Sequence, residues 1–287
     1  MNVNQVDKIT EPSAAKSNQK RNLNSTKLNL TIKKYIPIIS FFVLWECLTR
    51  LNITFELVNS NFFPPPSIIA VQGWQLIQTG VLTDSIISST IRVFVGTVIG
   101  ILAGVVLALI IGKSKLIDYW ASPILNMLGP IPSLAILPLF IIWFGIGEIP
   151  KIILIAWTVF FPVLTNTIEG IKSVRPVLIR SALSLGASDQ QIYKKVILPS
   201  VLPNILAGCQ ISLGLAFSAL VVSEMMGATS GLGYIIVDAR NYFKLSNMYV
   251  AIIVIGIEYS LFSYTLKLVE RKMLSWRKGG FADAIEK

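Results

Sequence analysis

The amino-acid sequence predicts an all-α, polytopic membrane protein with six transmembrane helices and both termini in the cytosol. Of its 287 residues, 53% are hydrophobic and only 14% are charged, which is far too apolar for a soluble globule. A bilayer core about 30 Å thick needs about 20 apolar residues per helix, so roughly half a dozen spans fit this length. An uneven distribution of Lys and Arg then sets the orientation.

The predicted spans follow from apolar runs that alternate with polar or proline-rich segments. Residues 1–34 are rich in Asn, Lys, Ser and Gln and lack apolar periodicity, which predicts a disordered cytosolic tail rather than a cleaved signal peptide. Residues 52–83 cannot span, and after three prolines they predict an amphipathic helix in the external interface. The predicted spans are residues 35–51, 85–111, 134–144, 152–167, 202–226 and 249–268.

Small residues recur every four positions along the second span, beginning with Gly96, Gly100 and Gly104. Such a stripe lets helix backbones approach closely in lipid, so we predict a helix-packing seam rather than a ligand site. The turn after this span, GKSK at 112–115, resembles the end of a phosphate-binding loop. Leu107 stands where that loop requires glycine, so the nucleotide-binding interpretation fails.

The basic residues fall mainly on one predicted side of the membrane, twenty against four. Cytosolic loops carry the excess of Lys and Arg, which puts both termini and the polar segment 171–199 in the cytosol. The net charge of +10 is therefore a topology signal, and no nucleic-acid partner is predicted. The predicted organisation is a tail at 1–34, a first helix with an external segment at 35–83, a core at 84–272 and a basic cytosolic tail at 273–287.

The segment 171–199 is a polar, helix-prone island between two apolar spans. Pro176 suits the first turn of a helix, and Gly186 suits a left-handed C-cap. Ser188 begins a capping box that starts a second helix, which we expect Pro199 to end. The prediction is a helix, a turn at Gly186 and a second helix, which together form a surface on which another protein can dock. A plain amphipathic surface hairpin is the alternative.

Polar and proline residues in the spans are the candidates for a translocation path or gate. Glu224 is a functional candidate because an acid inside a span is costly; it either contacts substrate or forms a gate hydrogen bond or ion pair with Arg240. Arg92 either snorkels to the interface or pairs internally. Pro130 and Pro132 interrupt the helix before the third span, after Pro123 has broken it earlier. The serine candidates, which line a path or bond to their own backbone, are Ser212, Ser218 and Ser223.

Metal, disulfide and hydrolytic chemistry find no support in the sequence. The chain has no histidine, and Cys47 and Cys209 both fall in apolar runs without CxxC spacing, so buried free thiols are expected and no metal or cofactor is predicted. An intramembrane hydrolase would need a nucleophile with a base. A secondary, ion-coupled transporter would show repeated halves with interrupted helices, and we find no such repeat. A secondary transporter and a non-transport membrane scaffold are the two alternative functions.

Residues 180–199 resemble the EAA loop, the cytosolic loop of the inner-membrane permease subunits of ABC importers. The family pattern is Glu-Ala-Ala, three residues, Gly, nine residues, Ile, one residue, Leu-Pro. The chain departs from it at Arg180 and Ser181, where the family usually has Glu and Ala. The matching positions are Ala182, Gly186, Leu198 and Pro199, with Val196 in place of Ile.

The resemblance covers nearly everything from residue 63 onward and looks like the nitrate, sulfonate and taurine branch of the family. The motifs that carry it are FPPPS at 63–67, PIPSLAILPLFIIWFGIGEIPKI at 130–152, SLGAS at 184–188 and SEMMGATSGLGYIIVDARN at 223–241. It implies the type I importer permease fold, called MetI-like, in a multi-pass protein of the cell inner membrane.

The resemblance also implies a function. Two permease copies, as a homodimer, would form the path for a small anionic or zwitterionic solute such as an aliphatic sulfonate, taurine or nitrate. Two copies of an ATPase subunit would dock under them and hydrolyse ATP, so this chain is not itself an enzyme. A periplasmic or lipoprotein binding protein would deliver the substrate. The residues implied to couple to the ATPase are Arg180, Ser181, Ala182, Gly186, Ala187, Ser188, Leu198 and Pro199.

Overall fold

The computed structural model describes residues 36–56, 59 and 61–277, and this part of the chain is helical apart from its turns and connections. It divides into two compact units, Met1–Ala70 and Val71–Lys287. The predicted tail at 1–34, and all but the beginning of the predicted tail at 273–287, lie outside the described residues.

The first unit contains a helix at Ile36–Phe55 and the beginning of α2 (Pro66–Gln78). Pro66 stands in the first turn of α2, where its missing N–H would have had no partner in the helix. The Glu46 carboxylate satisfies the next donor, because the Ser67 backbone N–H donates to Oε2 at 3.0 Å and the Ser67 hydroxyl donates to Oε1 at 2.8 Å. This carboxylate at the positive end of α2 ties its first turn to the preceding helix.

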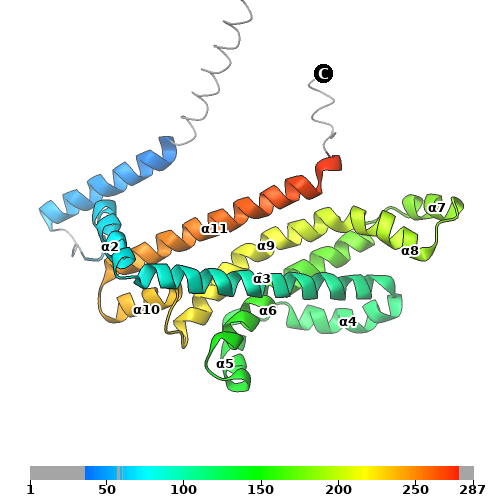
Figure 1. The fold of residues 1–287 in the computed structure, drawn as a ribbon, viewed down its shortest axis with the longest axis horizontal. Helices are drawn as coiled ribbons and strands as arrows, with labels where there is room; N and C mark the ends of the chain where they lie inside the picture. Colours follow the sequence, from blue (N-terminus) through cyan, green and yellow to red (C-terminus); the bar gives the residue numbers. More distant parts are fainter. Residues whose placement is uncertain (1–35, 57–58, 60, 278–287) are drawn as a thin grey trace, which may run out of the picture. The chain divides into compact units, whose positions relative to one another are not determined.

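The second unit, which contains the rest of α2, is a bundle of long helices with shorter helices at its two ends (Figure 1). Helices α7 and α8 lie at one end of α9, and α10 lies at the other end. The bounds are α3 Val81–Lys113, α4 Lys115–Leu128, α5 Ser133–Phe144, α6 Glu148–Lys172, α7 Pro176–Ser184, α8 Asp189–Ile192, η1 Tyr193–Ile197, α9 Leu198–Met225, α10 Leu232–Asn241, α11 Leu245–Met273 and η2 Ser275–Arg277.

Five helices in the described part of the chain are long and apolar enough to cross a membrane. A sixth span is present if α4 and α5, which are bent by 99° at a short break, count as one. Pro130 and Pro132 lie in that break, but the predicted break at Pro123 is wrong because Pro123 lies inside α4. A proline inside a helix removes one hydrogen bond and can be absorbed as a kink. The other five are Ile36–Phe55, Val81–Lys113, Glu148–Lys172, Asp189–Met225 and Leu245–Met273.

The core of the second unit is the packing of α6 against α3 on one side and α9 on the other. The glycine stripe of α3 lies at the closest approach to α6. A Cβ added at Gly96 would be 2.7 Å from Ile155 Cβ, and one added at Gly100 would be 2.6 Å from the Ala156 carbonyl oxygen. Gly104 continues the stripe against the backbone of α6. Only glycine allows the two backbones to come this close.

The expectation that Pro199 ends a helix is wrong. Residues Asp189–Met225 form one 37-residue helical run in which η1 is a π-helical turn. Within it the Leu198 N–H donates to the Tyr193 carbonyl, five residues back. Pro199 has no N–H to offer and its ring would crowd the preceding turn of a regular α-helix, so the wider π-turn lets the helix continue through it.

Candidate functional site

The connection between α7 and α8 is built by local backbone geometry. Gly186 has φ +76°, and its N–H donates to the Leu183 carbonyl at 2.9 Å. The Ala187 N–H donates to the Ala182 carbonyl at 3.1 Å. These two bonds and the left-handed residue form a Schellman motif, which satisfies carbonyls that the end of α7 would leave unpaired. The predicted left-handed C-cap at Gly186 is confirmed.

The second helix of this segment begins at the predicted capping box. The Ser188 N–H donates to Gln191 Oε1 at 2.9 Å, and the Gln191 N–H donates to Ser188 Oγ at 3.4 Å. One turn later, the Tyr193 hydroxyl donates to the Leu109 carbonyl of α3 at 2.7 Å. We refer to α7, α8 and their connection, residues 176–192, as the capped hairpin. Tyr193 anchors its second helix to α3, a role that the sequence did not suggest.

The surface of the capped hairpin is unusual because it exposes apolar side chains. Val177 is 58% exposed, Leu183 52% and Leu185 87%. No described residue forms an ion pair with Arg180, whose side chain lies on the exposed part of α7. Among the residues predicted to couple to an ATPase, Arg180, Ser181, Gly186, Ser188 and Leu198 are exposed, whereas Ala182, Ala187 and Pro199 are half-buried.

A second polar site lies at the end of the bundle that carries α10. The Arg92 guanidinium of α3 lies 2.7 Å from Glu224 Oε1 of α9 and 2.5 Å from Glu148 Oε2 of α6. Lys151 Nζ lies 3.0 Å from Glu148 Oε1. Arg92, Glu224 and Lys151 are buried, and we call these three residues with Glu148 the charge cluster. Two positive and two negative groups balance, so none of the three buried charges lacks a partner of opposite sign.

Glu224 is the most connected member of the charge cluster. Its Oε1 also accepts from the Ser89 hydroxyl at 2.8 Å, and its Oε2 accepts from the Gly233 N–H at the start of α10 at 2.8 Å. Of the two predictions for Arg92, internal pairing is confirmed. The proposed partner of Glu224 was Arg240, but the structure pairs Glu224 with Arg92, which lies 132 residues away in the sequence. No local pattern signals a pair at that separation.

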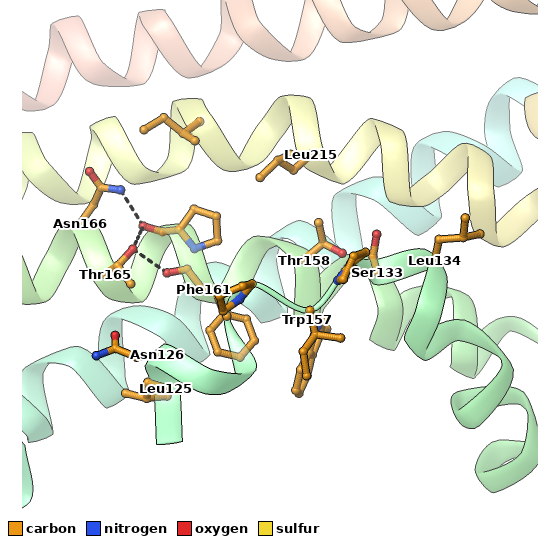
Figure 2. A pocket seen from close by; sticks show the side chains of 16 residues that line it. Leu125, Asn126, Ser133, Leu134, Trp157, Thr158, Phe161, Thr165, Asn166 and Leu215 are labelled. Atoms are coloured by element: carbon orange, nitrogen blue, oxygen red, sulfur yellow. Dashed lines mark hydrogen bonds between the residues drawn. The ribbon is translucent and has the colours of Figure 1, made fainter. Parts of the chain in front are cut away.

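The third feature is a cavity of about 680 Å³ beside the α4–α5 break (Figure 2). Pro130 and Pro132 line it, as does the glycine before them. Its other walls come from α4, α5, α6 and α9, and they combine apolar side chains with neutral polar ones. The neutral polar residues, which sequence reasoning missed, are Asn126, Ser133, Thr158, Thr165 and Asn166.

The three candidate serines of α9 lie elsewhere. The Ser212 hydroxyl donates to the Cys209 carbonyl at 3.0 Å, that of Ser218 to Gly214 at 3.2 Å, and that of Ser223 to Leu220 at 2.7 Å. Each therefore bonds to its own helix backbone, the second of the two predicted roles, and none lines the cavity. The described residues also contain no cluster of metal-ligating side chains.

These features define a class of protein. Five or six of the described helices are long and apolar enough to span a membrane, and one structured hairpin continues directly into a span, as in a multi-pass membrane protein. Comparison with known proteins identifies the family. Residues 96–273 match the model of the family described as "Binding-protein-dependent transport system inner membrane component".

Two curated relatives support the match. The chain is 38% identical over 234 residues to a putative aliphatic sulfonates transport permease, SsuC, of Bacillus subtilis (strain 168), covering 82% of this chain and 83% of the relative. It is 36% identical over 228 residues to the taurine transport system permease TauC of Escherichia coli (strain K12), covering 78% and 83%.

Solved structures agree on the fold. One is an amino acid ABC transporter crystallised with histidines, with a TM-score of 0.57 at 21% identity, covering 69% of this chain and 96% of that one. Another is the methionine ABC transporter MetNI in an inward-facing conformation, with a TM-score of 0.53 at 23% identity, covering 70% and 96%.

The chain belongs to the binding-protein-dependent transport system inner membrane component family. It is the permease subunit of an ABC importer, a multi-pass protein of the inner membrane. Its partners are an ATPase subunit, which hydrolyses the ATP, and a substrate-binding protein. The predicted MetI-like fold is confirmed.

Proposed function

We propose that the capped hairpin is the docking element for the ATPase, with Arg180, Ser181, Ala182, Gly186, Ala187 and Ser188 on it and Leu198 and Pro199 just behind it. The observation that carries this proposal is the direct continuation of the hairpin into α9. A capped helix joined to a span without a loop transmits force, whereas a flexible loop would absorb it. The exposed Val177, Leu183 and Leu185 supply the apolar surface that a partner would cover.

We further propose the assembly and orientation that this role requires. Two copies of the chain form a homodimer above two ATPase subunits, and both termini and the capped hairpin lie in the cytosol. The twenty-to-four distribution of Lys and Arg supports this orientation. Residues 84–272 form the permease core, with the first helix and external segment at 35–83 outside it. Within the core, the cavity beside Pro130 and Pro132 is a section of the translocation path, and the charge cluster around Glu224 closes the external end.

The proposed substrate is a small anionic or zwitterionic solute, and aliphatic sulfonates or taurine are preferred over nitrate. Two relatives named for these sulfur compounds each align with more than three quarters of this chain, which supports that preference. Uptake by the reconstituted complex of permease, ATPase and binding protein, measured with butanesulfonate, taurine and nitrate, tests it. Uptake of nitrate alone would overturn the sulfonate assignment.

Gly186→Val tests the docking role. A Cβ at Gly186 would meet nothing within 4 Å, so the effect of the substitution comes only from the left-handed backbone, which a β-branched residue disfavours by about 1–2 kcal/mol. We expect Gly186→Val to insert in the membrane normally and to lose at least tenfold in ATPase co-purification and uptake.

Gly186→Asn is the matched control, because asparagine tolerates the left-handed region. It should retain most of both activities. If Gly186→Val retains the ATPase as well as Gly186→Asn does, the capped hairpin is not the docking element.

A further inference from the structure

The lining of the cavity beside the α4–α5 break distinguishes between the proposed solutes. Among the described residues that form its walls, none carries a formal charge. Its polar groups include the two amides of Asn126 and Asn166 and three hydroxyls, of which those of Thr158 and Thr165 already donate to backbone carbonyls of α6. The Asn166 amide uses one N–H to donate to the Pro162 carbonyl at 2.8 Å, which holds the side chain at the cavity wall and leaves its second N–H free for a ligand (Figure 2).

The other walls are apolar and aromatic. Trp157 and Phe161 of α6 form an edge-to-face pair with ring centroids 4.9 Å apart. Leu215 of α9 and Leu125 of α4 contribute aliphatic walls on other sides. In addition, the Trp157 indole N–H is buried without an acceptor among the described residues. Because this nitrogen is shielded from the cavity as well as from solvent, it offers no donor to a solute there.

Such a lining accepts one kind of solute better than another. A sulfonate group needs hydrogen-bond donors, which the two amides and the Ser133 hydroxyl provide without a fixed cation that would hold the anion too tightly for passage. An alkyl chain gains from contact with aromatic and aliphatic walls. The ammonium group of taurine gains no such apolar contact, and it loses water at walls that offer neutral oxygen acceptors but no opposite charge.

We propose that this cavity is a transit site for aliphatic sulfonates, in which Asn126 and Asn166 donate to the sulfonate and the Trp157–Phe161 wall receives the alkyl chain. The site discriminates against the amino-substituted sulfonate taurine. This inference rests on the proposed function, since it concerns a cavity in the proposed path and a solute from the proposed class.

The test compares two solutes in one reconstituted complex of permease, ATPase and binding protein. Asn166→Asp replaces a donor by a carboxylate that repels a sulfonate and pairs with an ammonium. We expect butanesulfonate uptake to fall at least tenfold and taurine uptake to fall less, so that the taurine-to-butanesulfonate ratio rises at least fivefold over wild type. The preference of the binding protein cancels in this comparison, because the same binding protein serves both permeases.

Asn241→Asp is the matched control, with the same change of charge at an exposed position at the end of α10, outside the cavity. It should leave the ratio unchanged. Asn126→Asp repeats the test from α4, in case Asn166→Asp fails to assemble. An unchanged ratio in either assembled cavity variant, or a change equal to that of Asn241→Asp, overturns the transit site. If wild type moves neither sulfonate, the proposed substrate class itself is wrong, which is a separate outcome.

Discussion

Arg92 and Glu224 illustrate how single side chains organise this permease. Arg92 connects α3 to α6 through Glu148 and to α9 through Glu224, and its guanidinium also donates to the Ser230 carbonyl at 2.7 Å. Ser89 extends the network by accepting the Leu232 N–H at 2.9 Å. The charge cluster therefore fixes the connection between α9 and α10 as well as the helices themselves.

Removing Arg92 should be severe, because it leaves the Glu224 carboxylate buried without its counter-charge. We expect Arg92→Met to lower the free energy of unfolding by about 3–5 kcal/mol. Thermal unfolding of the purified chain in detergent measures this. Arg50→Met is the matched control, since Arg50 pairs with Glu46 at 2.7 Å but its side chain is 65% exposed. A melting temperature for Arg92→Met equal to that of Arg50→Met would show that the charge cluster contributes little to stability.

At the scale of elements, the seam between α3 and α6 depends on the absence of side chains. We expect Gly100→Ala to cost about 1–3 kcal/mol, since its Cβ would lie 2.6 Å from the Ala156 carbonyl oxygen and 2.7 Å from Val159 Cβ. Gly256→Ala in α11 meets nothing within 4 Å and should be neutral or slightly stabilising. The melting temperatures of the two variants measure the difference. Equal melting temperatures would show that Gly100 does not lie at a close contact between α3 and α6.

Elements were predictable from the sequence where the signal is local. Apolar runs located the spans, and the caps at Gly186 and Ser188 were correct because a left-handed glycine and a capping box depend only on neighbouring residues. The prediction that Pro199 ends a helix was wrong because the π-turn that accommodates this proline is a property of the whole helical run. The cavity was missed because its polar residues are neutral, are shared among α4, α5 and α6, and do not stand out in their own segments.

At the scale of the whole molecule, the proposed orientation can be tested by labelling. Leu185 on the capped hairpin is 87% exposed, and Tyr242 after α10 is 68% exposed. Cys47 is exposed, so the expectation of a buried thiol is wrong at this position and the native cysteine is replaced by Ser. In this Cys47→Ser background, we expect a membrane-impermeant maleimide to label Tyr242→Cys in intact cells and Leu185→Cys only after permeabilisation. Cys209 is 4% exposed and should react with neither protocol. The opposite labelling pattern would show that the capped hairpin lies outside the cell, and it would exclude docking of a cytosolic ATPase on the hairpin.

The continuous helical run Asp189–Met225 has a mechanical consequence. At about 1.5 Å per residue it is a rod about 55 Å long. Its first turn belongs to the capped hairpin, Leu215 in its second half lines the cavity, and its last turn carries Glu224. If the capped hairpin is the docking element that we propose, a movement of the hairpin is carried to Leu215 and to Glu224 by one continuous helix, without an intervening loop.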